Sequence, residues 1–162
     1  MEKISLKYSE PFIKETIRAY WWKNIGPLFP VIAILLTVFV IYRIVEGDRS
    51  WFVGGLGTLV IISFTVITAS YFVHLKRALS RLRRMKTPEA KLELGEDRFK
   101  VASDIGSSEI EWSLITNLWR FEHAWLLFFS GSEFMTLPVD GISAESKAFI
   151  IKKAEENGAK IT

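Results

Sequence analysis

Two long stretches without any charged residue dominate the pattern of apolar and polar positions along the chain. Residues 24–42 and 50–73 place apolar side chains on every side of a helix, without the alternation of a strand or the polar stripe of a surface helix. A helix needs about 20 mostly apolar residues to cross a bilayer, and both stretches meet that length. The pattern predicts transmembrane helices over 24–45 and 50–73, joined by a short loop at 46–49. So small a chain has too little other material to cover both stretches as core helices of a soluble protein.

The charges that flank these stretches predict their direction. The connecting loop has only Arg43 and Arg49, beside Glu46 and Asp48. Basic residues are far more frequent before the first stretch and after the second, where they are Lys3, Lys7, Lys14, Arg18, Lys23, Lys76, Arg77, Arg81, Arg83, Arg84 and Lys86. Cytoplasmic segments of membrane proteins carry the excess of Lys and Arg. Both termini are therefore expected on the cytoplasmic side.

The segment before the first stretch, residues 1–23, has two kinds of pattern. Residues 4–8 alternate like a short strand, and Ser9 is placed to cap a helix whose apolar side chains share one face. This helix either lies on the membrane surface or packs on the cytoplasmic domain, and the pattern leaves both open. Aromatic residues at the ends of the predicted spans suit the headgroup zone, and they are Trp21, Trp22, Trp51 and Tyr71.

The pattern changes after a basic helix or linker at 74–87, which Thr87 and Pro88 terminate. Residues 88–162 contain short alternating segments separated by turn residues, which predict strands at 91–94, 98–103, 108–112, 117–122, 125–130 and 133–137. A turn is expected at Gly131 and Ser132, and a final helix at 143–157, capped by Ser143 and ended by Gly158. The expected fold is therefore α+β: a transmembrane hairpin followed by a small antiparallel barrel or split sandwich with a C-terminal helix.

Charge divides the chain in the same place. The formal net charge of +3 conceals 13 basic and 5 acidic residues up to residue 86, against 8 basic and 13 acidic residues from residue 87 onward. The chain has no cysteine, which excludes a disulfide scaffold and any site built on thiolates, and 49% hydrophobic residues exclude a disordered chain. The acidic domain is expected to be repelled by an anionic membrane surface, while the basic segment is attracted to it.

The sequence offers no catalytic constellation. Its two histidines, His74 and His123, have no second ligand at the spacing of a zinc site, and a lone histidine is more often structural or solvated. Gly54-Gly55-Leu56-Gly57 imitates a dinucleotide motif but lies inside a predicted span. Neither of the stretches 24–42 and 50–73 contains a charged residue, which argues against a transporter. We therefore expect no catalytic residue, metal, cofactor, small-molecule substrate or nucleic-acid partner.

Three features remain as candidate sites. The first is a cluster of cations for lipid headgroups, consisting of Lys76, Arg77, Arg81, Arg83, Arg84 and Lys86, although topology alone also places cations there. The second is a set of small residues for close helix packing, consisting of Gly54, Thr58, Thr65 and Ala69, with the other span or another copy as partner. The third is a series of aromatic residues expected to form most of the domain core, consisting of Trp112, Trp119, Phe121, Trp125, Phe128, Phe129 and Phe134, with one of the adjacent pair Phe128 and Phe129 exposed.

The order of these elements resembles a known family. Two hairpin spans are followed by Glu109-Ile110-Glu111-Trp112-Ser113-Leu114-Ile115, an aromatic hairpin, and Leu137-Pro138 before a terminal helix. In this order the chain resembles the YcxB-like family of bacterial membrane proteins. The resemblance implies a pleckstrin-homology-like cytoplasmic domain and a location in the bacterial inner membrane, but it brings no established activity or functional residues.

The expected function is that of a non-enzymatic module anchored in the membrane. Its domain would bind a protein partner or another copy of itself, and its basic segment would contact anionic lipid. Two other classes stay open at this point: an enzyme or accessory subunit that acts on membrane lipid or peptide, and a small oligomeric channel or transporter subunit.

Overall fold

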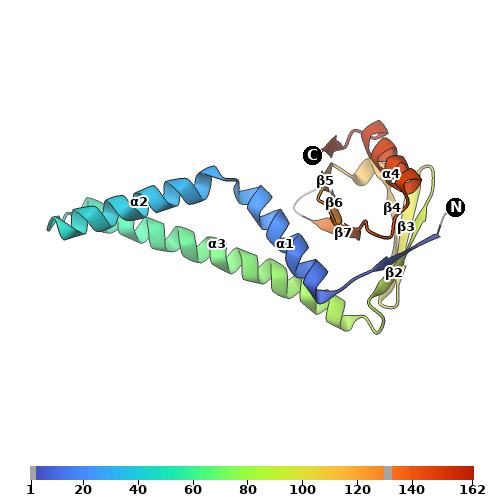
Figure 1. Ribbon diagram of the computed structural model, residues 1–162, viewed down its shortest axis with the longest axis horizontal. Coiled ribbons are helices and arrows are strands. Elements are labelled where there is room, and N and C mark those ends of the chain that lie inside the picture. The colour runs from blue at the N-terminus through green and yellow to red at the C-terminus, as the bar shows by residue number, and fades with distance from the viewer. Residues whose placement is uncertain (1–2, 130–132) are drawn as a thin grey trace. The chain divides into compact units, whose positions relative to one another are not determined.

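A computed structural model describes residues 3–129 and 133–162 of the chain (Figure 1). It divides into two compact units: a domain formed by residues 1–16 and 78–162, and a helical unit formed by residues 17–77. Because the domain takes residues from both sides of the helical unit, the helices form an insertion within the domain rather than an appendage at its end. The predicted strand end at Ser130 and turn at Gly131 and Ser132 lie outside the described residues.

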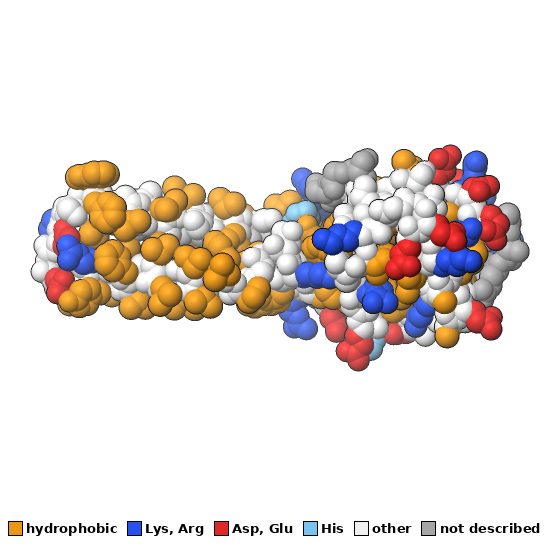
Figure 2. Space-filling view, turned by 90° about the horizontal axis from the view of Figure 1, so that it is seen from above, with side chains coloured by type: hydrophobic (Ala, Val, Ile, Leu, Met, Phe, Trp, Pro, Cys, Tyr) orange, Lys and Arg blue, Asp and Glu red, His pale blue; other side chains and the backbone are white. Residues whose placement is uncertain are grey.

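Three helices make up the insertion and its connections. Helix α1 is Glu10–Ile25, α2 is Leu28–Val45 and α3 is Trp51–Arg84. α2 begins later than the sequence predicted because Gly26, with φ of 73°, and Pro27 separate it from α1. Helices α2 and α3 are long and apolar enough to cross a membrane. Apolar side chains cover much of the visible surface of this unit (Figure 2).

The turn between α2 and α3 is held by charged side chains. Arg43 donates from Nε to Asp48 at 3.1 Å, and the backbone N–H of Ser50 donates to the other oxygen of Asp48 at 2.8 Å. Gly47 takes a φ of 86°, a backbone conformation that residues with a side chain rarely adopt. The short predicted loop is thus a compact turn in which Arg43 pairs with Glu46 and Asp48.

The domain begins with a four-stranded antiparallel sheet. Its strands lie in the order β1 (Lys3–Lys7), β2 (Glu89–Leu94), β3 (Arg98–Ser103) and β4 (Gly106–Glu111). The predicted N-terminal strand forms and pairs directly with β2, so that Leu6 lies opposite Ala90. The sequence had set residues 1–23 apart from residues 88–162, whereas the structure uses residues from both to build one sheet. Alternation explains this pairing, because Ile4 and Leu6 need a buried face that only the domain supplies.

A second sheet has the order β7 (Phe134–Pro138), β6 (Ala124–Phe128), β5 (Asn117–Arg120) and β8 (Lys160–Ile161). Strand β8, which the sequence did not predict, pairs in parallel with β5. The short 3₁₀ helix η1 (Trp112–Leu114) connects the two sheets along the chain, and α4 (Ala144–Glu156) precedes β8. The Ser143 hydroxyl accepts a hydrogen bond from the N–H of Ser146 at 3.1 Å, which confirms the predicted cap.

The two sheets stay open, and no barrel is closed among the described residues. Of the two expected forms, a barrel or a split sandwich, the barrel is therefore wrong: the structure has two open sheets and a C-terminal helix. Trp112 lies in the shared core with 1% of its surface exposed, and its ring centroid is 4.7 Å from that of Phe99. The Trp112 indole N–H donates to the carbonyl of Gly95 at 3.0 Å. Phe128 is buried and Phe129 half-buried, so neither of that predicted pair is exposed.

Candidate functional site

The best-defined polar site in the domain is the neck, which we define as the point where the chain leaves β1 and returns to β2. The N–H of Tyr8 donates to the carbonyl of Pro88 at 2.8 Å, so the two chain ends extend the pairing of the strands. Ser9 then caps α1, because its hydroxyl accepts from the N–H of Phe12 at 3.2 Å. Both connections to the helical unit therefore start at adjacent ends of paired strands.

An ion pair joins the two helices that meet at the neck. Arg83 near the end of α3 donates from Nε to Oε1 of Glu10, the first residue of α1, at 3.1 Å. Lys14 places its Nζ 3.8 Å from the other oxygen of Glu10. The Arg83 and Glu10 side chains are 69% and 41% exposed, so solvent screening limits the pair to about 1 kcal/mol or less. Arg83, predicted to contact lipid, thus has a partner within the protein.

Asp104 ties the neck to the turn between β3 and β4. Its carboxylate accepts hydrogen bonds from the backbone N–H groups of Lys86 and Thr87, which follow α3. This Asp satisfies backbone donors just beyond the helix end, a role that a carboxylate performs well. Local pattern indicates only a turn at Asp104, because its partners lie 18 and 17 residues away along the chain.

The cluster of cations predicted for lipid contact is divided between the two units. Lys76 and Arg77 are the last two residues of the helical unit. The other four belong to the domain, and they are Arg81, Arg83, Arg84 and Lys86. All six residues are exposed, and five of them lie on α3, which continues unbroken through Arg84. The sequence predicted a cluster of cations after the second apolar stretch, but it did not predict that one of them, Arg83, pairs with Glu10. Contact of these cations with lipid stays a prediction.

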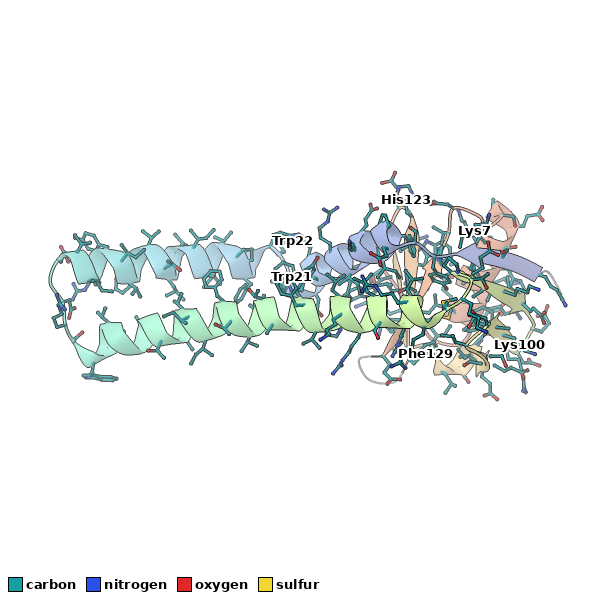
Figure 3. All side chains as sticks on the ribbon, turned by 90° about the horizontal axis from the view of Figure 1, so that it is seen from below. Lys7, Trp21, Trp22, Lys100, His123 and Phe129 are labelled. Carbon is teal, nitrogen blue, oxygen red and sulfur yellow. The ribbon has the colours of Figure 1, made fainter. Side chains whose placement is uncertain are left out.

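Three of the four predicted interface aromatics gather in the helical unit. The Trp21 ring centroid lies 5.8 Å from that of Tyr71 and 5.4 Å from that of Trp22 (Figure 3). Trp51, at the start of α3, is 87% exposed and lies beside Phe52. Nearby, the His74 ring contacts the Tyr20 ring at 5.9 Å between centroids. Edge contacts of this kind hold α1 against α3 within the unit.

The small residues Gly54, Thr58, Thr65 and Ala69 lie on an exposed side of α3. The residues of α3 that are turned inward include Val53, which is buried, and Gly57, where a Cβ atom would lie 3.5 Å from Val40 of α2. The helical repeat explains the difference, because Val53 and Gly57 are one turn apart and Gly54 is rotated away from them. Packing of the predicted set inside the hairpin is therefore not what the structure has, and packing against another copy stays a prediction.

His123 has a carboxylate partner that the sequence did not predict. Its Nδ1 lies 3.0 Å from Oδ1 of Asp140, which follows β7. The hydrogen bond and charge of Asp140, with smaller effects of Glu122 and Glu15, raise the pKa of His123. Both side chains are exposed, and among residues 3–129 and 133–162 no cluster of His, Asp and Glu could hold a metal ion.

These observations define a class of α+β protein in which a pair of long apolar helices is inserted between two neighbouring strands of a small domain with two open sheets. The model of the family described as YcxB-like protein matches residues 94–154, so the resemblance is confirmed over that segment. The matched segment runs from the end of β2 into α4. No curated protein and no solved structure matches the chain.

Proposed function

We propose that this protein is a non-enzymatic interaction module anchored in the bacterial inner membrane by α2 and α3. The observation that carries the proposal is the insertion of the apolar helices between β1 and β2, which are direct neighbours in one sheet. Both chain connections of the domain then pass into the membrane, so the domain is held at two points. An anchor of this kind suits a module whose task is to hold a partner near the membrane.

The charge distribution supports a cytoplasmic domain. The cations Lys76, Arg77, Arg81 and Arg84 follow the apolar part of α3, while the turn between α2 and α3 has fewer cations, one of which, Arg43, pairs with Asp48. Basic residues beside a span favour the cytoplasmic side. With an even number of spans, both termini lie there too.

The layout of the domain supports a pleckstrin-homology-like module. Two open sheets share one core, and α4 packs against that core through Ile150 and Ala154, which are 1% and 0% exposed. Lys153 of α4 forms an ion pair with Glu96, in the turn between β2 and β3, at 2.6 Å. The helix therefore closes the core at one end and leaves the strand edges and turns for recognition.

A protein partner fits the domain better than a lipid headgroup. Residues from 87 onward carry 13 acidic against 8 basic side chains, so an anionic membrane repels this part of the domain. The segment near α3 has the opposite sign, and each cation close to an anionic surface contributes about 1 kcal/mol of attraction. In this proposal the basic segment contacts lipid and the domain binds protein.

The test is recovery of the full-length protein from native membranes in mild detergent, with mass spectrometry of the proteins and lipids that it retains. A chain ending at Lys86 is the comparison, since it keeps the apolar helices and loses β2 to β8. We expect a stoichiometric protein partner that the shortened chain does not retain. Recovery of the same partner by both chains would overturn the role of the domain.

The lipid part has its own test. Arg81→Ala/Arg84→Ala should reduce the retained anionic lipid and leave the domain folded, because both side chains are exposed and neither belongs to the ion pair between Arg83 and Glu10. Lys152→Ala/Lys160→Ala is the matched control, with the same charge change on exposed positions of α4 and β8. Equal lipid retention in the two variants would remove the electrostatic contribution of the basic segment.

A further inference from the structure

The two sheets have four edge strands, and the structure protects three of them. Edges β1 and β7 face each other: the Tyr8 hydroxyl donates to the carbonyl of Thr136 at 3.1 Å, and a Cβ atom on Gly141 would lie 3.7 Å from the carbonyl oxygen of Ser5. The third edge, β8, is only two residues long. The fourth, β4, is six residues long and exposed along its whole length except at Ile110, which is half-buried.

The backbone of β4 directs a row of hydrogen-bonding groups away from the sheet. Antiparallel partners alternate between pairs that exchange hydrogen bonds and pairs that do not. The N–H of Trp112 donates to the carbonyl of Asp97 at 3.2 Å, which continues the ladder and fixes its phase. Ser108 and Ile110 therefore bond to β3, whereas the N–H and C=O groups of Ser107, Glu109 and Glu111 point outward. An edge of this kind is a template for another strand.

Charges along the same sheet alternate in sign from strand to strand. Lys3 of β1 lies opposite Glu93 of β2, Glu93 lies opposite Lys100 of β3, and Lys100 lies opposite Glu109 of β4 (Figure 3 labels Lys100). The ion pair between Lys3 and Glu93 is formed at 3.2 Å. A second row places Arg98 opposite Glu111. Both rows end on a carboxylate at β4, so the next position in each row favours a cation.

We propose that the edge of β4 binds an extended basic segment of a protein partner, which adds a fifth strand to the sheet. The segment would carry Lys or Arg at two positions separated by one residue, opposite Glu109 and Glu111, with an apolar residue between them beside Ile110. A second copy of this chain fits less well, since two-fold pairing of β4 with itself brings two acidic edges together and, in the registers centred on Glu109 or Ile110, sets Glu109 opposite Glu109 or Glu111. This inference rests on the proposed function and names the chemistry of the protein partner.

The test uses the full chain in nanodiscs of neutral phosphatidylcholine and a short fluorescent peptide that alternates Lys and Val. Fluorescence anisotropy should show binding to loaded nanodiscs and none to empty ones. Hydrogen exchange should show new protection of the amides of Ser107, Glu109 and Glu111. A peptide that alternates Glu and Val, and a Lys–Val peptide methylated on the backbone nitrogens that face β4, should bind at least about tenfold more weakly.

Variants of the protein separate the edge from general charge. Glu109→Lys/Glu111→Lys should weaken the Lys–Val peptide at least about tenfold and favour the Glu–Val peptide. Glu155→Lys, an exposed change of the same sign on α4, is the control and should bind as the unaltered chain does. If Glu109→Lys/Glu111→Lys unfolds, Glu109→Gln/Glu111→Gln replaces it in the test. This variant should bind the Lys–Val peptide about threefold more weakly than the unaltered chain does.

The outcomes also separate this inference from the proposed function. No binding of the Lys–Val peptide, equal binding of its methylated form, or an equal effect of Glu155→Lys overturns the basic strand at β4. Another outcome is a partner that is recovered from membranes and protects amides of the domain outside β4. This result overturns binding at the edge of β4 but is consistent with the anchored interaction module. Recovery of the same partner by the chain that ends at Lys86 overturns the module itself.

Discussion

The helical unit and the domain use the same apolar side chains in opposite ways. In the domain, Leu92 and Leu118 are 1% and 0% exposed, whereas in α2 Leu35 and Val45 are 64% and 80% exposed. The domain hides its apolar residues from water within one core, and its visible surface mixes both signs of charge (Figure 2). The domain is thus stabilised by its own buried core, while the helical unit leaves exposed an apolar surface that suits two helices long and apolar enough to cross a membrane.

The largest effect on stability is expected at the buried Trp112, and the exposed Trp51 is its control. Trp112→Ala should lower the free energy of unfolding of the domain by about 3–5 kcal/mol, because it opens a cavity beside Phe99 and leaves the carbonyl of Gly95 without its donor. Trp51→Ala, at a residue that is 87% exposed, should leave that free energy unchanged. Denaturant unfolding of the full chain, followed by hydrogen exchange of the β-strand amides, measures both. Similar losses in the two variants would break the comparison.

A charge placed in each unit tests the need for a bilayer. Leu35→Arg in α2 should raise the apparent free energy of membrane insertion by about 3 kcal/mol, because the exposed side of this helix would face hydrocarbon. Leu114→Arg in η1, where the leucine is 51% exposed, should change domain stability by about 0.5 kcal/mol or less. An insertion assay in membranes reads the first and denaturant unfolding the second. Unchanged insertion of the Leu35 variant would show that α2 is not a span.

Tyr8 sharpens the comparison at the edge of the domain. Tyr8→Phe should cost about 1 kcal/mol, because it removes the hydrogen bond to the carbonyl of Thr136 that joins β1 to β7. Burial raises the pKa of Tyr8 from 10.0 to about 12. The folded state therefore keeps the phenol proton more firmly than the unfolded chain. The stability that this difference in the pKa of Tyr8 contributes is complete below pH 10, and it is lost as the pH rises through the folded pKa near 12.

Unfolding of both proteins between neutral pH and pH 12 measures this contribution. The unaltered chain should lose more stability than Tyr8→Phe over the alkaline range. Parallel alkaline losses in the two proteins would assign the pH dependence to other groups.

The smallest effect is expected at the exposed pair His123 and Asp140. Asp140 raises the pKa of His123 through its hydrogen bond and charge, and Glu122 and Glu15 add to the effect. The resulting stability is fully present below the ordinary value of 6.5 and is lost as the pH rises through the raised pKa. Asp140→Asn should lower the pKa of His123 in an NMR titration, and Glu155→Gln should not. An unmoved titration in Asp140→Asn would exclude Asp140 as the cause.

Local pattern predicted most of the elements, because each is specified by neighbouring residues. Residues 98–103 were predicted as a strand and form β3 with those bounds, and Ser143 caps α4 as expected. Alternation and capping act within a few residues, so they are visible in the sequence. The uncharged stretches likewise predicted α2 and α3, although the break at Gly26 and Pro27 moved the start of α2, and α3 continues past the predicted end at residue 73 to Arg84.

What the sequence missed depends on pairing at a distance. Strand β8 is two residues long and pairs with β5, so it has no period of its own. The partners of Asp104, Asp140 and Glu10 lie on other elements, and no local signal names them. The small residues of α3 illustrate the same limit. Their spacing is one that allows close helix packing, but whether they face α2 depends on the rotation of α3 about its axis.

The insertion of the helices between β1 and β2 has a consequence for the order in which the chain can fold. Strand β1 is synthesised first, yet its neighbour β2 follows only after residues 8–88 have emerged. Free in solution, the closure of so long a loop would carry a large entropy cost before any pairing offsets it. If α2 and α3 insert into a membrane as a hairpin during synthesis, as the proposed function requires, the two ends of this loop are brought together in advance. On this view the bilayer acts as a folding template, and the first sheet is completed only after insertion.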